Sequence, residues 1–225
     1  MLIACWSPKG GSGTTVVATA LGLVLSSGRG GALLADLAGD VPAALGLPEP
    51  GGAGLADWLV AGADVPDDAL SRLEVEVSPT LGLLPAGRSP SASGPTALTA
   101  AVDSARGEAL AAALAGERRP VVADCGLAAA GPALAVAAAA TLSLLVLRPC
   151  YLALRRALAA PIKPSGVVLV SEVGRALGRR DVEEVLGVPV RAEVAYDPAV
   201  ARAVDAGLLA GRVPRILERS LRQAA

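Results

Sequence analysis

The sequence predicts a single α/β domain: a doubly wound, mostly parallel sheet with helices on both faces. Three observations carry this prediction. Short apolar runs alternate with helical segments along the chain, a glycine-rich loop and a helix follow the first run, and aspartates stand where two of the runs end. Strands that alternate with helices form parallel sheets covered on both faces, because each crossover lays a helix against the sheet.

Length and composition agree with one compact domain. The 225 residues suit one sizeable core, and a hydrophobic content of 53% excludes disorder of the whole chain. Aromatic residues make up only 2% and Phe is absent, so the core must consist of Leu, Val and Ala. The 20 basic and 21 acidic residues give a net charge of −1, which argues against a surface coated with positive charge for nonspecific nucleic-acid binding.

The first half of the chain is expected to contain a βαβ unit and then a less regular stretch. The expected elements are a strand at 2–6, a helix at 16–25, a strand at 32–35 that delivers Asp36 to its end, a short helix at 55–61 and a strand that closes the run 75–84. Residues 86–96 have the composition of a mobile surface loop within this single domain of residues 1–225.

The second half continues the alternation. The expected elements are a helix at 97–115, a strand at 120–123 that presents Asp124, a helix at 133–140, a strand at 142–147, a helix at 152–160, a strand at 167–170, a helix at 180–186, a strand at 188–194 and a helix at 199–206. The apolar stretch 133–147 has about 15 residues against the roughly 20 that span a bilayer, so it predicts a buried helix end and a strand.

The cysteines and the N-terminus indicate a cytoplasmic protein. Cys5, Cys125 and Cys150 show no C-x-x-C spacing and adjoin apolar runs, as buried free thiols in a reducing compartment do. The absence of His and of a cysteine cluster argues against a transition-metal site. The opening residues lack the charged and long apolar regions of a signal peptide.

The loop after the first strand carries the main functional signal. Gly10, Gly11 and Gly13 lie between an expected strand and an expected helix, where backbone N–H groups can approach phosphate oxygens closely. The ordinary phosphate-loop pattern G-x-x-x-x-G-K-[ST] does not fit, because the chain has Pro8 and Thr14 where that pattern has Gly and Lys.

Written as K-G-G-x-G-x-T, the run from Lys9 to Thr15 resembles the deviant Walker A motif of the MinD/ParA family of P-loop NTPases. In that family the early lysine, here Lys9, reaches the phosphates across a nucleotide-sandwich dimer. Asp36 in LLADLAGD matches the acidic end of the family's second strand, and Asp124 in VVADCG matches its Walker B aspartate. The segment VAYDPAVARAVDAG resembles its last strand and helix, so the resemblance covers nearly the whole chain.

The resemblance implies a homodimer that holds ATP and Mg²⁺ at its interface. It assigns nucleotide binding to Lys9, Gly10, Gly11, Ser12, Gly13, Thr14 and Thr15, and the metal to Thr15, Asp36 and Asp124. Composition supports Lys9 independently. Of the 20 basic residues, only Lys9 and Lys163 are lysines and the rest are Arg. A lysine beside a glycine loop is suited to phosphate, because its ammonium group is a flexible point charge. The alternatives are a solvated charge for Lys9 and strand-end caps for the two aspartates.

Two departures from the family pattern bear on catalysis. Thr14 replaces the family's second loop lysine, and Ala38 replaces the later aspartate of D-x-D, which orients the attacking water. Asp40 lies nearby and is the catalytic candidate beside Lys9, although its spacing differs and a turn or cap role is the alternative. Phosphoryl transfer depends on positioning and charge neutralisation, so these losses should slow hydrolysis more than they weaken binding.

Loss of this second lysine is characteristic of the CpaE/TadZ-like branch of the family, which is associated with Tad-type pilus machinery, and of related septum-site proteins. In this respect the chain resembles that branch. The sequence thus predicts a nucleotide-dependent dimerising switch with weak or partner-stimulated ATP hydrolysis, which positions a pilus-assembly or cell-division complex, with recruitment to the pole or the inner membrane face. A catalytically silent pseudo-ATPase scaffold is the alternative, and a ParA-type DNA-partitioning ATPase ranks below both. A dinucleotide-dependent oxidoreductase is weaker still, because the loop lacks G-x-G-x-x-G.

Two further surfaces are candidates for DNA or membrane contact. Arginines cluster at 148–156 and at 175–180, where a solvated face is favoured over DNA binding. Val213, Ile216, Leu217 and Leu221 have largely helical spacing among arginines. That tail could bind a membrane surface, as MinD tails do, but its lack of bulky aromatics favours docking onto its own domain.

Overall fold

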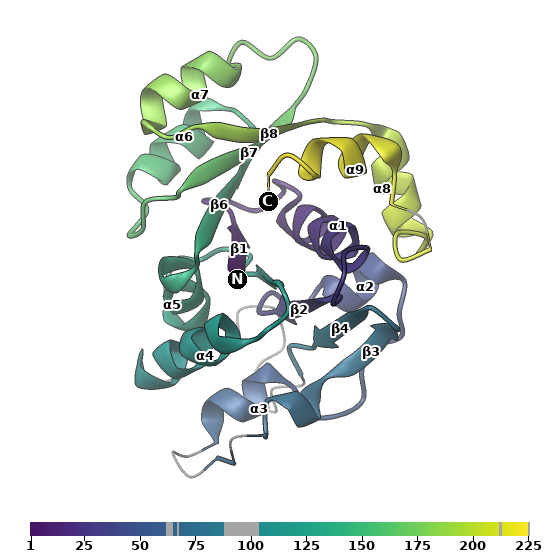
Figure 1. Ribbon diagram of the computed structural model, residues 1–225. Helices are drawn as coiled ribbons and strands as arrows, with labels where there is room; N and C mark the ends of the chain where they lie inside the picture. Colours follow the sequence, from purple (N-terminus) through teal and green to yellow (C-terminus); the bar gives the residue numbers. More distant parts are fainter. Residues whose placement is uncertain (62–64, 67, 88–103, 212, 225) are drawn as a thin grey trace.

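A computed structural model describes residues 1–61, 65–66, 68–87, 104–211 and 213–224 (Figure 1). Its strands are β1 Leu2–Trp6, β2 Ala32–Asp36, β3 Val75–Ser78, β4 Leu81–Leu84, β5 Val121–Asp124, β6 Leu142–Leu147, β7 Gly166–Ser171 and β8 Val190–Ala195. Its helices are α1 Thr14–Ser26, α2 Val41–Leu45, α3 Leu55–Val60, α4 Ser104–Gly116, α5 Gly131–Ala139, α6 Tyr151–Leu158, α7 Arg179–Leu186, α8 Pro198–Asp205 and α9 Arg215–Leu221, with a 3-10 turn at Ser71–Leu73.

The described strands form one sheet in the order β3-β4-β2-β5-β1-β6-β7-β8. Every neighbouring pair is parallel except β3 with β4, so the predicted doubly wound, mostly parallel fold is confirmed. β1 lies between β5 and β6, and the chain runs to β2 on one side of it and later to β6, β7 and β8 on the other. Ligands of such sheets bind beyond the carboxyl ends of the strands where the direction of winding changes.

Helices cover both faces of the sheet, and the core consists mainly of Leu, Val and Ala, as expected, together with Trp6 and Ile3. The core against α1, α2 and α9 is separate from the core against α3 to α7, and Figure 1 shows the two groups on opposite sides. Small residues allow close packing. A Cβ at Gly22 of α1 would lie 2.6 Å from Leu34 Cδ2, so the helix backbone sits directly on β2.

Two expectations for the first half need correction. The run 75–84 is a hairpin of two antiparallel strands, because Pro79 and Thr80 separate a half-exposed strand from the buried β4. The one-turn helix α2 at Val41–Leu45 follows Asp40, in a stretch for which no element was expected. The loop expected at 86–96 lies outside the described residues from 88 onward, as does the expected helix start at 97–103.

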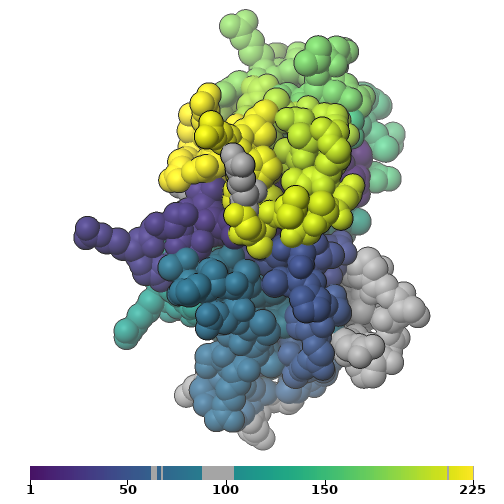
Figure 2. Space-filling view, turned by 90° about the vertical axis from the view of Figure 1, so that its right-hand side faces the viewer, coloured from purple at the N-terminus to yellow at the C-terminus, as the bar shows by residue number. Residues whose placement is uncertain are grey.

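The C-terminal helix α9 docks onto its own domain. Leu217 and Leu221 are buried, and α9 contacts α1 and β8. Figure 2 shows the yellow C-terminal segment lying directly against the rest of the chain. Among the described segments, no helix is long and apolar enough to cross a membrane.

Candidate functional site

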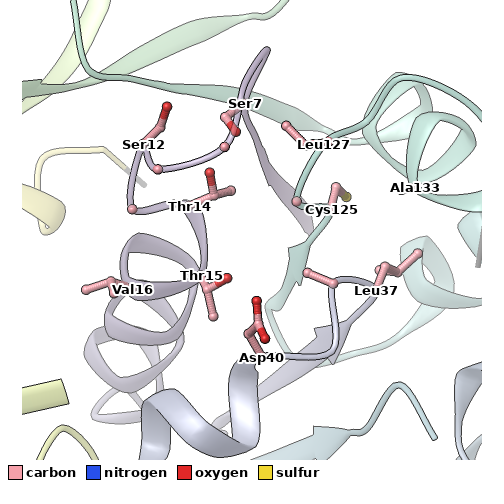
Figure 3. Close-up of a pocket in the computed structure, with 15 residues that line it drawn as sticks. Ser7, Ser12, Thr14, Thr15, Val16, Leu37, Asp40, Cys125, Leu127 and Ala133 are labelled. Carbon is pink, nitrogen blue, oxygen red and sulfur yellow. The ribbon is translucent and has the colours of Figure 1, made fainter. Parts of the chain in front are cut away.

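The glycine loop leaves β1 and turns directly into α1 at the carboxyl edge of the sheet (Figure 3). Gly11 and Gly13 have φ of 78° and 82°, a region that residues with a Cβ rarely adopt. A Cβ placed at Gly10, Gly11 or Gly13 would meet no protein atom within 4 Å. The loop therefore needs glycine for its backbone conformation, and it faces open space rather than packed protein.

The start of α1 presents backbone donors to this space. Gly13 is the residue that caps the helix, and it has no side chain to accept from the first-turn N–H groups. Unpaired N–H groups at a helix start carry partial positive charge and favour anions. The loop is held in shape internally, because the Ser7 and Ser12 hydroxyls donate to the Lys9 carbonyl oxygen at 2.9 and 3.3 Å.

A cavity of about 390 Å³ lies between this loop and the ends of β2 and β5. All the predicted loop residues from Gly10 to Thr15 line it, and so does Asp40. Its volume falls within the range of small-molecule sites. The structure thus brings together most of the residues that the sequence assigned to nucleotide binding.

Lys9 is the exception within the loop. Its side chain is half-buried, its Nζ donates to the Gly10 carbonyl oxygen at 3.2 Å, and it does not line the cavity. In a single protomer this ammonium group is therefore turned onto its own loop.

Asp36 and Asp124 are direct neighbours at the ends of β2 and β5, with their Cα atoms paired across the sheet. Both are fully buried and neither lines the cavity itself. Asp36 accepts from three backbone N–H groups, with Oδ1 receiving Ala38 at 3.1 Å and Gly39 at 2.6 Å and Oδ2 receiving Val41 at 3.1 Å. This aspartate fixes the turn that leads into α2.

Burial and, to a smaller extent, the negative charge of Asp124 raise the pKa of Asp36 to about 7. The three N–H donors oppose this shift. Burial also raises the pKa of Asp124 to about 6, with a smaller contribution from the charge of Asp40. The nearby Thr15 hydroxyl and the Gly126 N–H lower it. Among the described residues, no side-chain cation lowers the pKa of either of these two neighbouring carboxyl groups.

One oxygen of Asp124 lacks a partner. Its Oδ1 accepts from the Gly126 N–H at 3.1 Å, whereas its Oδ2 is buried without a hydrogen-bond partner among the described residues. Asp40 is exposed at the start of α2 and makes no side-chain cap. In Figure 3 its carboxylate points toward Thr15.

These residues fit a Mg²⁺-bound triphosphate. The open glycine loop can take phosphate oxygens, and the unpaired Asp124 oxygen beside Thr15 can accept from a metal-bound water. Within the described ranges, no three His, Cys, Asp or Glu side chains gather into a metal cage. Magnesium does not need one, because it keeps several waters and uses one or two carboxylates together with substrate phosphates.

The sequence analysis missed the wall opposite the loop. Cys125, Gly126 and Leu127 line the cavity, and the Gly126 carbonyl oxygen accepts from the Ser7 N–H at 2.8 Å. Their position directly after Asp124 was the available signal. Burial raises the pKa of the Cys125 thiol well above its usual range, so this group stays protonated.

The arginines considered for DNA contact are partly neutralised. Arg148 and Arg175 both pair with Glu172, at 2.8 and 2.7 Å, and Arg179 pairs with Glu183 at 3.2 Å. Arg148 also stacks over Tyr196 at 4.8 Å. Acidic partners reduce the positive field of these clusters.

Several solved structures share this fold, whereas no protein-family model and no curated protein sequence matches the chain. A ParA family ATPase from Chlorobium tepidum is similar with a TM-score of 0.78 and 20% identity, over 98% of this chain and 96% of that one. MinD of Pyrococcus horikoshii, solved with Mg-ADP, gives 0.74 and 18%, over 99% and 93%. The MinC:MinD complex of Aquifex aeolicus gives 0.72 and 18%, over 98% and 94%. The chain therefore has the fold of MinD and ParA structures.

Proposed function

We propose that this chain is a nucleotide-dependent dimerising switch of the MinD/ParA type. The observation that carries the proposal is the open glycine loop at the start of α1, facing a cavity next to an unpaired, buried Asp124 oxygen. Fold similarity to MinD with Mg-ADP supports ATP and Mg²⁺ as its ligands.

Each part of the site has a separate task in this proposal. Backbone N–H groups of residues 10–15 bind the phosphates, and Thr15 and Asp124 hold the metal, with Asp36 behind them. Bound Mg²⁺ would neutralise charge on the phosphates. Lys9 of a second copy supplies the ammonium group that a single protomer turns away from the cavity.

Hydrolysis in this switch is weak or depends on a partner protein. Thr14 adds no charge to the phosphate site and Ala38 cannot orient a water, while the Asp40 carboxylate points toward Thr15 and is the remaining candidate for that task. The partner is a pilus-assembly complex of the CpaE/TadZ type or a cell-division complex, which the switch positions. A MinC:MinD complex among the similar folds favours a protein partner of this kind.

Light scattering coupled to size-exclusion chromatography tests this proposal. The wild type should elute as a dimer with ATP and Mg²⁺ and as a monomer without them, and Lys9→Ala should remain monomeric. Lys163→Ala is a matched control, because Lys163 is exposed and lies just before β7, at the amino edge of the sheet. An unchanged mass in every state would remove the basis of the switch.

A pseudo-ATPase scaffold is the second candidate, and the replacements Thr14 and Ala38 favour it. The two candidates differ in phosphate release. If the purified wild-type dimer releases no phosphate from ATP above background, even after addition of a cell extract that contains candidate partner proteins, the scaffold is indicated.

A further inference from the structure

The segment from Arg148 to Gly187 differs in charge from the rest of the chain. It contains seven basic and four acidic residues and so has a net charge of +3, whereas the whole chain has −1. The structure describes this segment completely, as α6, β7 and α7 with their connecting loops. One end of the sheet is therefore covered by a basic segment in an otherwise acidic protein.

Most acidic side chains of this segment are already engaged. Glu172 and Glu183 form the ion pairs with arginines described above, and Asp181 accepts from the Gly178 N–H at 2.7 Å. The side chains with no ion pair or hydrogen bond among the described residues are one carboxylate, Glu184, and four exposed cations, Arg155, Arg156, Lys163 and Arg180. The excess of unpaired positive charge favours an anionic partner.

Exposed apolar side chains concentrate on the same segment. Tyr151 is 78% exposed and Leu158 is 63% exposed, both on α6. Of the eleven exposed large hydrophobic residues in the described part of the chain, the segment contributes five: Tyr151, Leu152, Leu158, Val173 and Val185. Exposed apolar side chains that cluster mark an interaction surface, whereas scattered ones need no explanation.

α6 combines both features on one helix. Its core side consists of Ala153, Leu154 and Ala157, which are buried. On its solvent side, Tyr151, Arg155 and Leu158 follow one another at the spacing of successive helical turns and form one row. The helix contains no acidic residue. Its outer face is therefore both cationic and apolar.

α7 lies beside α6 and widens this face (Figure 1). Leu154 of α6 and Val182 of α7 belong to the same core, so the two helices form one layer on the same face of the sheet. We call the outer face of this layer the α6–α7 surface, and it consists of Tyr151, Leu152, Arg155, Arg156, Leu158, Arg180 and Val185. Two helices in one layer present a broad face to a partner.

We propose that the α6–α7 surface binds an anionic lipid bilayer. Its Tyr, Leu and Val side chains insert among the headgroups, and its arginines contact the lipid phosphates. A nucleic acid would satisfy the cations but leave these apolar side chains in water, whereas an anionic bilayer offers partners to both. The surface is separate from the C-terminal helix α9, whose Leu217 and Leu221 are buried in the core. The inference does not depend on the proposed nucleotide switch.

Sedimentation with sucrose-loaded vesicles tests the inference on the nucleotide-free full chain. The wild type should bind vesicles made of equal parts of phosphatidylglycerol and phosphatidylcholine. Its apparent dissociation constant should be at least about tenfold higher on pure phosphatidylcholine, because the cations then lack anionic lipids. Added salt should weaken binding to the anionic vesicles for the same reason.

Two pairs of substitutions separate the two contributions. Arg155→Gln/Arg156→Gln should bind anionic vesicles about 10- to 30-fold more weakly, since each basic residue near such a surface contributes about fivefold. Arg155→Lys/Arg156→Lys keeps the charge and should bind nearly as well as the wild type. Tyr151→Ser/Leu158→Ser keeps the charge but removes apolar area, and it should weaken binding at least about tenfold.

A matched control changes the same kinds of residue elsewhere. Arg202 and Leu208 are exposed, in and just after α8, whose half-buried side chains pack on the opposite core. Arg202→Gln/Leu208→Ser should therefore leave vesicle binding unchanged. All substituted side chains are exposed, and thermal melting shows whether each variant is folded.

Three results would overturn the inference: no binding of the wild type to anionic vesicles, equal binding to pure phosphatidylcholine, or full binding by both α6 variants. Soluble polyglutamate and duplex DNA serve as competing probes. If the wild type binds either of them but not the vesicles, an acidic protein or a nucleic acid replaces the bilayer as the partner. If a variant does not fold, the lipid and salt dependence of the wild type decides the question. Nucleotide binding without vesicle binding would leave the proposed function intact.

Discussion

The two sides of the cavity differ in what they offer a ligand. The glycine loop, residues 10–15, presents uncharged backbone donors to open space. The carboxylate side, Asp36, Asp40 and Asp124, brings acidic groups together, and the two buried ones have pKa values raised by burial. Neither side compensates the other, because no described lining residue is a cation. The site is thus built for an anion on one side and a cation on the other.

The two sides of the cavity also differ in how much they contribute to the stability of the fold. The three loop glycines have open space where a side chain would lie, so changes at these positions should affect ligand binding more than folding. Asp36 fixes the turn before α2 through three backbone N–H groups, so changes on the carboxylate side should affect folding as well. Substitutions on the two sides can therefore test the comparison.

The largest effect is expected on the loop side, at Gly13. Gly13→Val places a β-branched residue at φ 82°, which strains the backbone by about 1–3 kcal/mol and closes the space before α1. Nucleotide binding should fall below detection in calorimetry, whereas the thermal midpoint should drop only moderately. Gly10→Ala is the control for folding, because Gly10 has no positive φ and should leave the melting temperature unchanged.

On the carboxylate side, Asp36→Ala should cost about 2–4 kcal/mol of unfolding free energy, since it leaves backbone donors without an acceptor. Asp36→Asn keeps one acceptor oxygen and should lose roughly half as much. Urea denaturation of both variants measures these losses. Equal stability of Asp36→Ala and the wild type would mean that the turn before α2 does not depend on this carboxylate.

Much of this fold could be predicted because its signals are local. The apolar run of β1, the glycines after it and the Ala-rich α1 follow one another in sequence, and the strand ends at Asp36 and Asp124 were placed correctly. The hairpin was missed because its first strand is short, half-exposed and read as continuous with β4. The helix α2 was missed because five residues are too few for a periodic pattern.

The site was only partly predictable for a related reason. Gly10 to Thr15 are consecutive, so their motif shows in the sequence, and their common cavity follows from it. The Lys9 side chain turns onto the carbonyl oxygen of the next residue, and the unpaired Asp124 oxygen depends on packing between distant segments. No pattern of residue types contains that information.

A smaller effect, on the pH dependence of stability, is expected at Asp124, the second buried carboxyl group. The pKa of Asp124 is raised in the folded protein from 3.8 to about 6, so folding favours its protonated form. The stability of the unliganded protein therefore falls as the pH rises between these two values, and it levels off above the higher one. Asp124→Asn cannot ionise. It should therefore be more stable than the wild type by about 1–3 kcal/mol at pH 8 and by roughly half as much at pH 5. Chemical denaturation at both pH values measures the difference, and a constant gap between the two proteins would contradict this origin.

The smallest effect concerns the metal itself. A cation near Asp36 and Asp124 favours their ionised forms, so its binding must release protons where these groups are still partly protonated, below about pH 7. The affinity for Mg²⁺ in the presence of AMPPNP should therefore rise by less than about tenfold between pH 6 and pH 8. Titration calorimetry in buffers of different ionisation enthalpy detects the released protons directly. Asp124→Asn, which has one titrating carboxyl group fewer, should release fewer protons than the wild type, and equal release would place the metal away from the carboxylate side.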